Sequence, residues 1–112
     1  MYNSNSSPFF VLGVYSLGCY LTYPGRRIFN YALNPSIKGS DVIQQCINSA
    51  NRIVRRNFQG IGITNTGSGY KCTADPRADL RYKRNGKASC GSDGFGSSSA
   101  NGTTVFMFTG DY

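Results

Sequence analysis

The sequence lacks histidine, glutamate and tryptophan altogether, and acidic residues occupy only five of its 112 positions. Histidine is the commonest general acid or base in enzymes, and glycoside hydrolysis needs a pair of suitably placed carboxyl groups. The four interior aspartates are spread along the chain and are typical of turns and helix caps; they are Asp41, Asp75, Asp79 and Asp93. We therefore expect a protein that is not an enzyme.

Motifs for metals and nucleotides are also missing. Structural zinc sites are built from closely spaced cysteines and histidines, but no two cysteines here form a CxxC or CxxxC pair. The glycines of residues 60–67 lack the dinucleotide-binding spacing, and residues 85–89 lack the Walker A spacing. The glycine-rich residues 93–101 contain one acid, Asp93, whereas a calcium loop presents several carboxylates. We predict neither a metal nor a cofactor.

Cysteine is scarce but even in number, with four residues at positions 19, 46, 72 and 90. An even set spread through a short chain is typical of two disulfides and of an oxidising, extracellular setting. Free cysteines in the core of a cytosolic protein are the alternative interpretation. Residues 8–21 are apolar, but they lack the basic flank and cleavage site of a signal peptide and are too short to span a bilayer as a helix. We interpret them as mature sequence and expect the signal peptide of a secreted protein not to be present in this chain.

Positive charge dominates, because twelve lysines and arginines stand against five aspartates and leave a formal net charge of +7. Such a balance favours acidic partners, such as nucleic acid, sulfated or uronic glycans and anionic surfaces, or it serves solubility. Residues 81–87 place this charge around an aromatic ring and are ligand-binding candidates: Arg81, Tyr82, Lys83, Arg84 and Lys87. Aromatic rings stack on bases or sugars, while Arg and Lys bind phosphate, carboxylate or sulfate. A solvated basic hairpin is the alternative, and the disulfide-type cysteines make nucleic acid the less expected partner.

Residues 40–57 carry the clearest periodic pattern in the chain. Apolar side chains recur there at spacings of three and four and predict one stripe of a helix; they are Val42, Ile43, Cys46, Ile47, Ala50, Ile53 and Val54. Ser40 suits the N-cap, and Asp41 suits the positive end of the helix dipole. The last turn is rich in cations, which favour its negative end: Arg52, Arg55 and Arg56. Cys46 lies on the apolar stripe, so we expect its disulfide partner beneath the helix.

Short segments rich in branched and aromatic residues predict strands; they are residues 9–21, 26–33, 58–65, 70–72 and 103–112. The first segment is consistent with two strands or with one strand bent at Gly13, and we expect the second segment to end at Asn34-Pro35. The glycine-rich residues 66–69 predict a turn between the third and fourth strands, and Asn85-Gly86 predicts a further turn.

These elements predict an α+β fold in which one helix, over about residues 40–57, packs on a small, mainly antiparallel sheet. We expect residues 1–8 to be a flexible N-terminal segment and residues 9–112 to form a single domain stapled by two disulfides. Four cysteines allow three pairings. Of these we predict Cys46–Cys72, from the helix to the strand beneath it, and Cys19–Cys90.

The cysteine-bearing segments follow one another in a characteristic order. Gly18-Cys19-Tyr20 and a nearby arginine come first, then Cys46 in the helix, the strand pair from Phe58 to Cys72, the group Tyr82, Gly86, Lys87 and Cys90, and the stretch from Asp93 to Phe106. This order, over residues 17–108, resembles the WSC-like, cysteine-rich extracellular module of secreted invertebrate proteins. The resemblance implies an extracellular, non-catalytic module, with carbohydrate as the ligand. Asn65 and Tyr70 lie in the matched strand pair, and we add them to the ligand-binding candidates.

Two functions of different classes fit these observations. The first is a non-catalytic extracellular binding module that recognises glycans or anionic matrix polymers. The second is a structural subunit of an extracellular fibre, coat or adhesive, in which the apolar residues 9–17 add to a neighbour's open sheet edge and produce self-association. Two N-x-S/T sequons make Asn5 and Asn101 glycosylation candidates. No membrane span is predicted.

Overall fold

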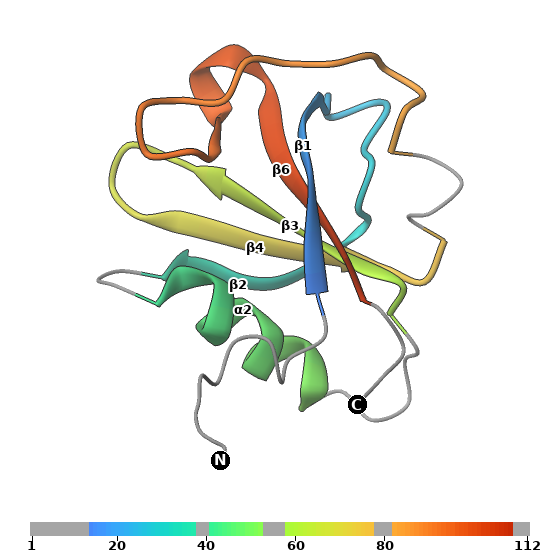
Figure 1. The fold of residues 1–112 in the computed structure, drawn as a ribbon, viewed down its shortest axis with the longest axis vertical. Helices are drawn as coiled ribbons and strands as arrows, with labels where there is room; N and C mark the ends of the chain where they lie inside the picture. Colours follow the sequence, from blue (N-terminus) through green and yellow to red (C-terminus); the bar gives the residue numbers. More distant parts are fainter. Residues whose placement is uncertain (1–13, 38–40, 53–57, 78–81, 109–112) are drawn as a thin grey trace.

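The computed structural model describes residues 14–37, 41–52, 58–77 and 82–108, and these ranges form one helix, one short 3₁₀ turn and a six-stranded sheet (Figure 1). The elements follow in the order β1 (Val14–Leu21), β2 (Tyr31–Ile37), α2 (Val42–Asn51), β3 (Gly60–Asn65), β4 (Tyr70–Asp75), β5 (Gly96–Ser97), the 3₁₀ turn η1 (Ser98–Ala100) and β6 (Gly102–Phe108). The sheet order is β1-β6-β3-β4-β2, and β5 lies beside β3. All pairings are antiparallel except that of β5 with β3. The predicted α+β fold is confirmed.

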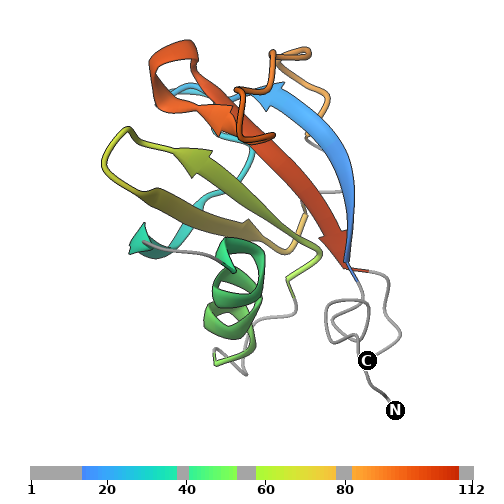
Figure 2. The ribbon, with the colours of Figure 1, turned by 60° about the vertical axis from the view of Figure 1, so that its left-hand side comes forward.

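α2 covers one face of the sheet, on which it contacts β2, β3 and β4 (Figure 2). Because side chains alternate between the two faces of a strand, every second residue of β3, β4 and β6 points toward the helix. The core on this face includes Cys46, Ile47, Ile61, Ile63, Cys72, Ala74 and Phe106. The apolar stripe predicted for residues 40–57 is therefore the buried side of α2.

The start of α2 differs in detail from the prediction. Asp41, and not Ser40, is the N-cap residue; its φ is 61°, and its side chain makes no capping hydrogen bond. Aspartate tolerates this left-handed conformation better than most residues, so the chain turns sharply into the helix at this point. Arg52 is the C-cap residue, while residues 53–57, with Arg55 and Arg56, lie outside the described residues.

β2 corrects the prediction that a strand over residues 26–33 ends at Asn34-Pro35. The strand begins at Tyr31 and continues through Pro35 to Ile37, with register shifts on both sides of Asn34. Proline has no N–H to donate to a neighbouring strand, but β2 lies at the edge of the sheet, where proline is tolerated. The position of the strand in the sheet thus outweighs the local signal of its sequence.

Residues 22–30, which we call the covering loop, connect β1 to β2 and pack on the sheet face opposite α2. Ile28 and Phe29 are buried there with Tyr20, Val105 and Met107. The Phe29 ring lies so close to β3 that a Cβ at Gly62 would fall 2.6 Å from its Cδ2 atom. Glycine at position 62 therefore allows the covering loop to approach the sheet.

β1 begins within the segment predicted over residues 9–21, whose first part, residues 9–13, lies outside the described residues together with the predicted flexible residues 1–8. The pairing of β1 with β6 shifts between Ser16 and Gly18, and Gly18 has a φ of 96°. This bulge precedes Cys19, whose side chain is buried beside β6.

Both predicted disulfides are present, and all four cysteines are paired. Cys46–Cys72 ties α2 to β4, and both of its residues are fully buried. Cys19–Cys90 ties β1 to the segment before β5; Cys19 is buried, whereas Cys90 is exposed. Of the helices in the described ranges, none is long and apolar enough to cross a bilayer.

Candidate functional site

The basic loop, residues 82–88, lies along the outer edge of the second half of β1. Its backbone pairs with that strand, because Leu21 N donates to Gly86 O at 2.9 Å and Ala88 N donates to Cys19 O at 3.0 Å. The turn predicted at Asn85-Gly86 is confirmed, with Gly86 at a φ of 92°. The loop is therefore held in place by the sheet on one side and by Cys90 shortly after it.

Asn85 fastens the basic loop to the covering loop. Its Nδ2 donates to Leu21 O at 3.1 Å and to Arg26 O at 2.6 Å. Nearby, Arg84 Nη2 donates to Arg27 O at 3.3 Å. The bonds to Arg26 O and Arg27 O join the two loops that carry most of the described cations, and the bond to Leu21 O ties Asn85 to the end of β1.

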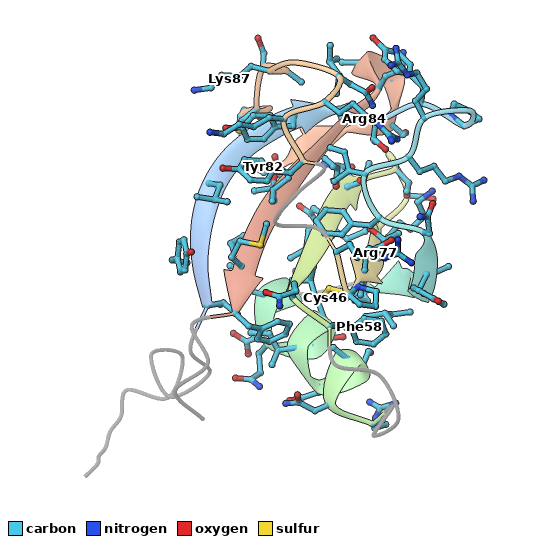
Figure 3. All side chains as sticks on the ribbon, turned by 90° about the vertical axis from the view of Figure 1, so that its right-hand side faces the viewer. Cys46, Phe58, Arg77, Tyr82, Arg84 and Lys87 are labelled. Atoms are coloured by element: carbon cyan, nitrogen blue, oxygen red, sulfur yellow. A yellow bond between two sulfur atoms is a disulfide. The ribbon has the colours of Figure 1, made fainter. Side chains whose placement is uncertain are left out.

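Of the candidates in residues 81–87, Arg81 lies outside the described residues, and Figure 3 shows Tyr82, Arg84 and Lys87 at the end of the sheet away from α2. The Tyr82 ring packs edge-on against Tyr20, with ring centroids 5.0 Å apart. Lys83 Nζ lies 5.6 Å from the Tyr82 centroid, and Lys87 Nζ lies 6.0 Å from the Tyr20 centroid. The half-buried Tyr82 ring thus holds the Lys83 ammonium by cation–π contact, and the buried Tyr20 ring holds that of Lys87.

Asn65 and Tyr70, the other two candidates, are joined to Asp93 and not to the basic loop. Asn65 Nδ2 and the Tyr70 hydroxyl both donate to Asp93 Oδ2, at 2.8 and 2.7 Å. Asp93 Oδ1 accepts from Phe95 N at 2.9 Å. The three side chains, which we call the Asp93 cluster, hold the glycine-rich segment before β5 against the end of β3 and β4. Their polar groups are already used inside the protein, so the structure assigns them an anchoring part.

The hydrogen bonds of the Asp93 cluster move two pKa values in opposite directions. The Phe95 N–H, followed by the Tyr70 hydroxyl and the Asn65 amide, lowers the pKa of the Asp93 carboxyl below its usual value of 3.8. Donation to that carboxylate raises the pKa of Tyr70 above its usual value of 10.0. The cluster is therefore complete when Asp93 is charged and Tyr70 is neutral, which covers the whole neutral range of pH.

We expect this cluster to make stability depend on pH at both extremes. Because the pKa of Asp93 is lower in the folded protein, its stabilising effect is present above about pH 4 and is lost as the pH falls through the folded value. Because the pKa of Tyr70 is raised, its effect is present below about pH 10 and is lost at higher pH. Urea unfolding across the acid range should show a steeper loss of stability for the native sequence than for Asp93→Asn. Equal slopes for the native protein and Asp93→Asn would contradict the assignment.

A pocket of about 350 Å³, which we call the threonine pocket, lies between the covering loop, the sheet and the turn before β6. Sequence reasoning did not find it. Its serine and threonine hydroxyl groups come from the covering loop, β3, β4, η1 and β6: Thr22, Thr64, Thr73, Ser98 and Thr103. Lys71 and Thr73 lie on the face of β4 opposite the buried Cys72 and Ala74, so the pocket is on the side of the sheet away from α2. The one feature of the sequence that points to this pocket is the alternation of polar and apolar residues along β4, which predicts a polar face on that strand.

Two cations and two amides complete the wall of the threonine pocket. Arg27 comes from the covering loop and Lys71 from β4, and both are exposed. Asn30 Nδ2 donates to Asp75 Oδ2 at 3.0 Å, which fixes the orientation of the Asn30 amide. Asn101, one of the two glycosylation candidates, also lines the pocket and is exposed, while Asn5 lies outside the described residues.

Buried polar residues also lie at this pocket: Thr64 and Thr103 line it, and Asp75 lies beside it. Asp75 is 2% exposed, and it accepts from Asn30 N, Asn30 Nδ2 and Arg77 N. Thr103 is also 2% exposed, and its hydroxyl oxygen has no hydrogen-bond partner within the described residues. Arg27 and Lys71 are the only charged side chains among the described lining residues, and the Asp75 carboxylate lies one hydrogen bond away, on Asn30.

The fold and this site define a small α+β domain with two disulfides and a polar, cation-bearing pocket. In the parts of the chain that the structure describes, no group of three or more potential metal ligands is gathered in one place. Comparison with protein-family models, with curated proteins and with solved structures finds no match to this chain.

Proposed function

We propose that this protein is a non-catalytic, secreted binding module that recognises anionic glycans or other acidic polymers of the extracellular matrix. The observation that carries the proposal is an uneven distribution of charge. The covering loop, the basic loop and the pocket face of β4 together present six exposed or half-exposed cations: Arg26, Arg27, Lys71, Lys83, Arg84 and Lys87. A surface of one charge sign attracts a polymer of the opposite sign and accelerates its association.

The described carboxylates do not neutralise this surface. Asp75 is buried, and it accepts hydrogen bonds from Asn30 and Arg77. Asp93 is bound within its own cluster beside Tyr70 and Phe95, and Asp41 lies at the start of α2. A polyanion lying over the two loops therefore meets cations without an opposing carboxylate from the described residues, which leave out Asp79 and Asp111.

Two further observations support the choice of an extracellular glycan. The two disulfides are typical of proteins in oxidising compartments. The sequence resemblance to WSC-like modules favours carbohydrate over nucleic acid. The threonine pocket agrees with this choice, because hydroxyl and amide side chains lie next to its cations. Sulfate and carboxylate groups on a sugar chain match such a mixture of charged and neutral donors.

Binding to heparin and to a uronic polymer at low and high salt tests the proposal. We expect binding that weakens steeply with salt, because exposed charges are screened over about 10 Å at 0.1 M ionic strength. Lys87→Gln should weaken binding about two- to fivefold, as expected for one solvent-exposed charge contact. Arg52→Gln is the matched control, since it removes one exposed cation at the end of α2. An absence of polymer binding at low salt, or tighter binding to duplex DNA than to the glycans, would contradict the proposal.

A structural subunit is the second candidate function, and the edge of β1 favours it. The basic loop covers the Cys19–Leu21 half of that edge, whereas the Val14–Leu17 half pairs, within the described residues, only with β6. Tyr15, in this half, is 50% exposed. An uncovered strand edge can pair with another chain. Light scattering at increasing concentration should then show assembly that Tyr15→Lys reduces, and a native protein that remains monomeric at high concentration would exclude this function.

A further inference from the structure

We propose that the threonine pocket binds a single acidic sugar unit, a uronate or a sulfated pyranose, and provides the specificity that the exposed cations of the basic loop do not. This inference rests on the proposed function, since it names the part of the anionic polymer that the protein recognises. The pocket is distinct from the ligand-binding candidates of the basic loop, because none of Tyr82, Lys83, Arg84 and Lys87 lines it.

The size and the support of the pocket suit one small, rigid unit. Its volume of about 350 Å³ is at the lower end of the range found for ligand sites. Its base is formed by β3 and β4, and β4 is tied to α2 by Cys46–Cys72. Its opposite wall, the covering loop, is fastened by the bonds from Arg84 and Asn85 to Arg27 and Arg26. A site held on both sides loses little conformational freedom when a ligand binds.

The cations of the pocket provide the recognition of a negative group. Lys71 is the second residue of β4, and Arg27 comes from the covering loop on the other side of the pocket. The guanidinium of Arg27 can bind a carboxylate or sulfate with two parallel N–H donors, and the ammonium of Lys71 adds a point charge. No carboxylate among the described lining residues competes for either cation.

The neutral groups of the pocket provide both acceptors and donors for sugar hydroxyls. Asn30 uses its Nδ2 on Asp75, so its Oδ1 remains available as an acceptor. The Thr73 hydroxyl donates to Gly62 O at 3.4 Å, which leaves its lone pairs for an incoming donor. The Thr22 hydroxyl accepts from Ile28 N at 3.2 Å, which leaves its proton for an incoming acceptor.

An aromatic residue completes the match to a pyranose ring. Tyr23 lines the pocket and is 38% exposed, so its ring is accessible to a bound molecule, whereas Phe29 is buried against Gly62. Rings with an apolar face and a polar tip are suited to sugars, which also have apolar C–H faces and polar edges. Arg27, Lys71, Asn30 and Tyr23 therefore form one site for a unit that is both acidic and hydroxylated.

The test is a titration of the isotope-labelled full chain with three disaccharides followed by amide chemical shifts. The probes are an unsulfated uronate disaccharide, a sulfated disaccharide and a neutral disaccharide of the same size. We expect shifts at Asn30, Lys71 and Thr73 with at least one acidic probe, and about tenfold weaker binding of the neutral one, because a charge-assisted hydrogen bond is lost. The acidic probe that binds more tightly identifies the group as carboxylate or sulfate.

Two matched variants make the test specific to the pocket. Lys71→Gln should weaken binding of the acidic disaccharide about tenfold. Arg77→Gln removes an exposed cation that follows β4 but does not line the pocket, and it should leave that affinity within about twofold. Lys71 is exposed and outside both cores, so the variant is expected to fold, and circular dichroism checks this.

The possible failures of the two proposals are distinguishable. Heparin binding without pocket shifts, or equal effects of Lys71→Gln and Arg77→Gln, would overturn the pocket site and leave the proposed function in place. Equal binding of the neutral and acidic disaccharides would overturn the requirement for an acidic group. Absence of both heparin binding and disaccharide binding would overturn both proposals.

Discussion

Replacement of Cys46 and Cys72 by alanine is expected to lower the free energy of unfolding by about 3 to 4 kcal/mol, from the chain entropy that the cross-link removes. The two cysteines are 26 residues apart in sequence, and both are fully buried between α2 and β4. The loss of two buried sulfur atoms adds to the entropic effect, because the surrounding core relaxes only partly. For a domain whose total stability is typically about 5–15 kcal/mol, this is a large fraction. Urea unfolding followed by circular dichroism measures it, and a change below about 1 kcal/mol would contradict the expectation.

The Cys19–Cys90 disulfide is the internal comparison for this result. Cys90 is exposed, whereas neither sulfur of Cys46–Cys72 is accessible. Thiol–disulfide exchange requires access of the attacking thiolate, so a mild reductant should open Cys19–Cys90 in the folded protein. Cys46–Cys72 should open only when the domain unfolds. Alkylation and peptide mapping at successive times would show this order, and simultaneous reduction of both bonds would contradict it.

Gly96→Ala is expected to destabilise the protein by about 3 kcal/mol, at the upper end of the effects found for overpacking. A Cβ at position 96 would lie 2.5 Å from Thr103 N, 2.6 Å from Gly102 C and 2.7 Å from Thr103 Cα. All three are backbone atoms of β6, so they cannot move aside as a side chain can. The same residue anchors the strand pairing, because Gly96 N donates to Thr104 Oγ1 at 2.9 Å and Gly96 pairs with Thr64 of β3. Thermal and urea unfolding measure the effect.

Gly25→Ala is the matched control for this substitution. A Cβ at Gly25 meets no atom within 4 Å, and its backbone does not require glycine. Such a change reduces the freedom of the unfolded chain and should leave stability unchanged or raise it by up to about 1 kcal/mol. Equal free energies of unfolding for the two alanine variants would contradict the prediction that the close approach of β5 to β6 requires glycine at position 96.

Much of the architecture follows from short-range patterns in the sequence. The apolar spacing of three and four defines α2, and the branched and aromatic segments define β3, β4 and β6, because periodicity is a property of each segment alone. Cys46 on the buried stripe also requires a partner beneath the helix, which is Cys72. The course of β2 through Pro35 is not visible in the same way, because a proline is tolerated only through the place of the strand at the sheet edge.

The candidate site was predictable only in part. The basic loop is recognisable from its charges and from Asn85-Gly86, and the described candidates in it lie together. Asn65 and Tyr70 look like equal candidates in the sequence, but Asp93, distant along the chain, occupies their polar groups. A sequence does not show which partner a polar side chain will meet across the fold.

By itself, the sequence determines that this protein is a basic, disulfide-bonded α+β domain without histidine or glutamate for catalysis. Only the tertiary structure decides where a ligand has room to bind. Residues of the covering loop, β3, β4 and the start of β6 come together in the threonine pocket. No pattern in the sequence predicts that these segments will lie next to one another. The physical reason is that composition and periodicity act within a segment, whereas a pocket depends on how segments distant in the chain pack around the same space.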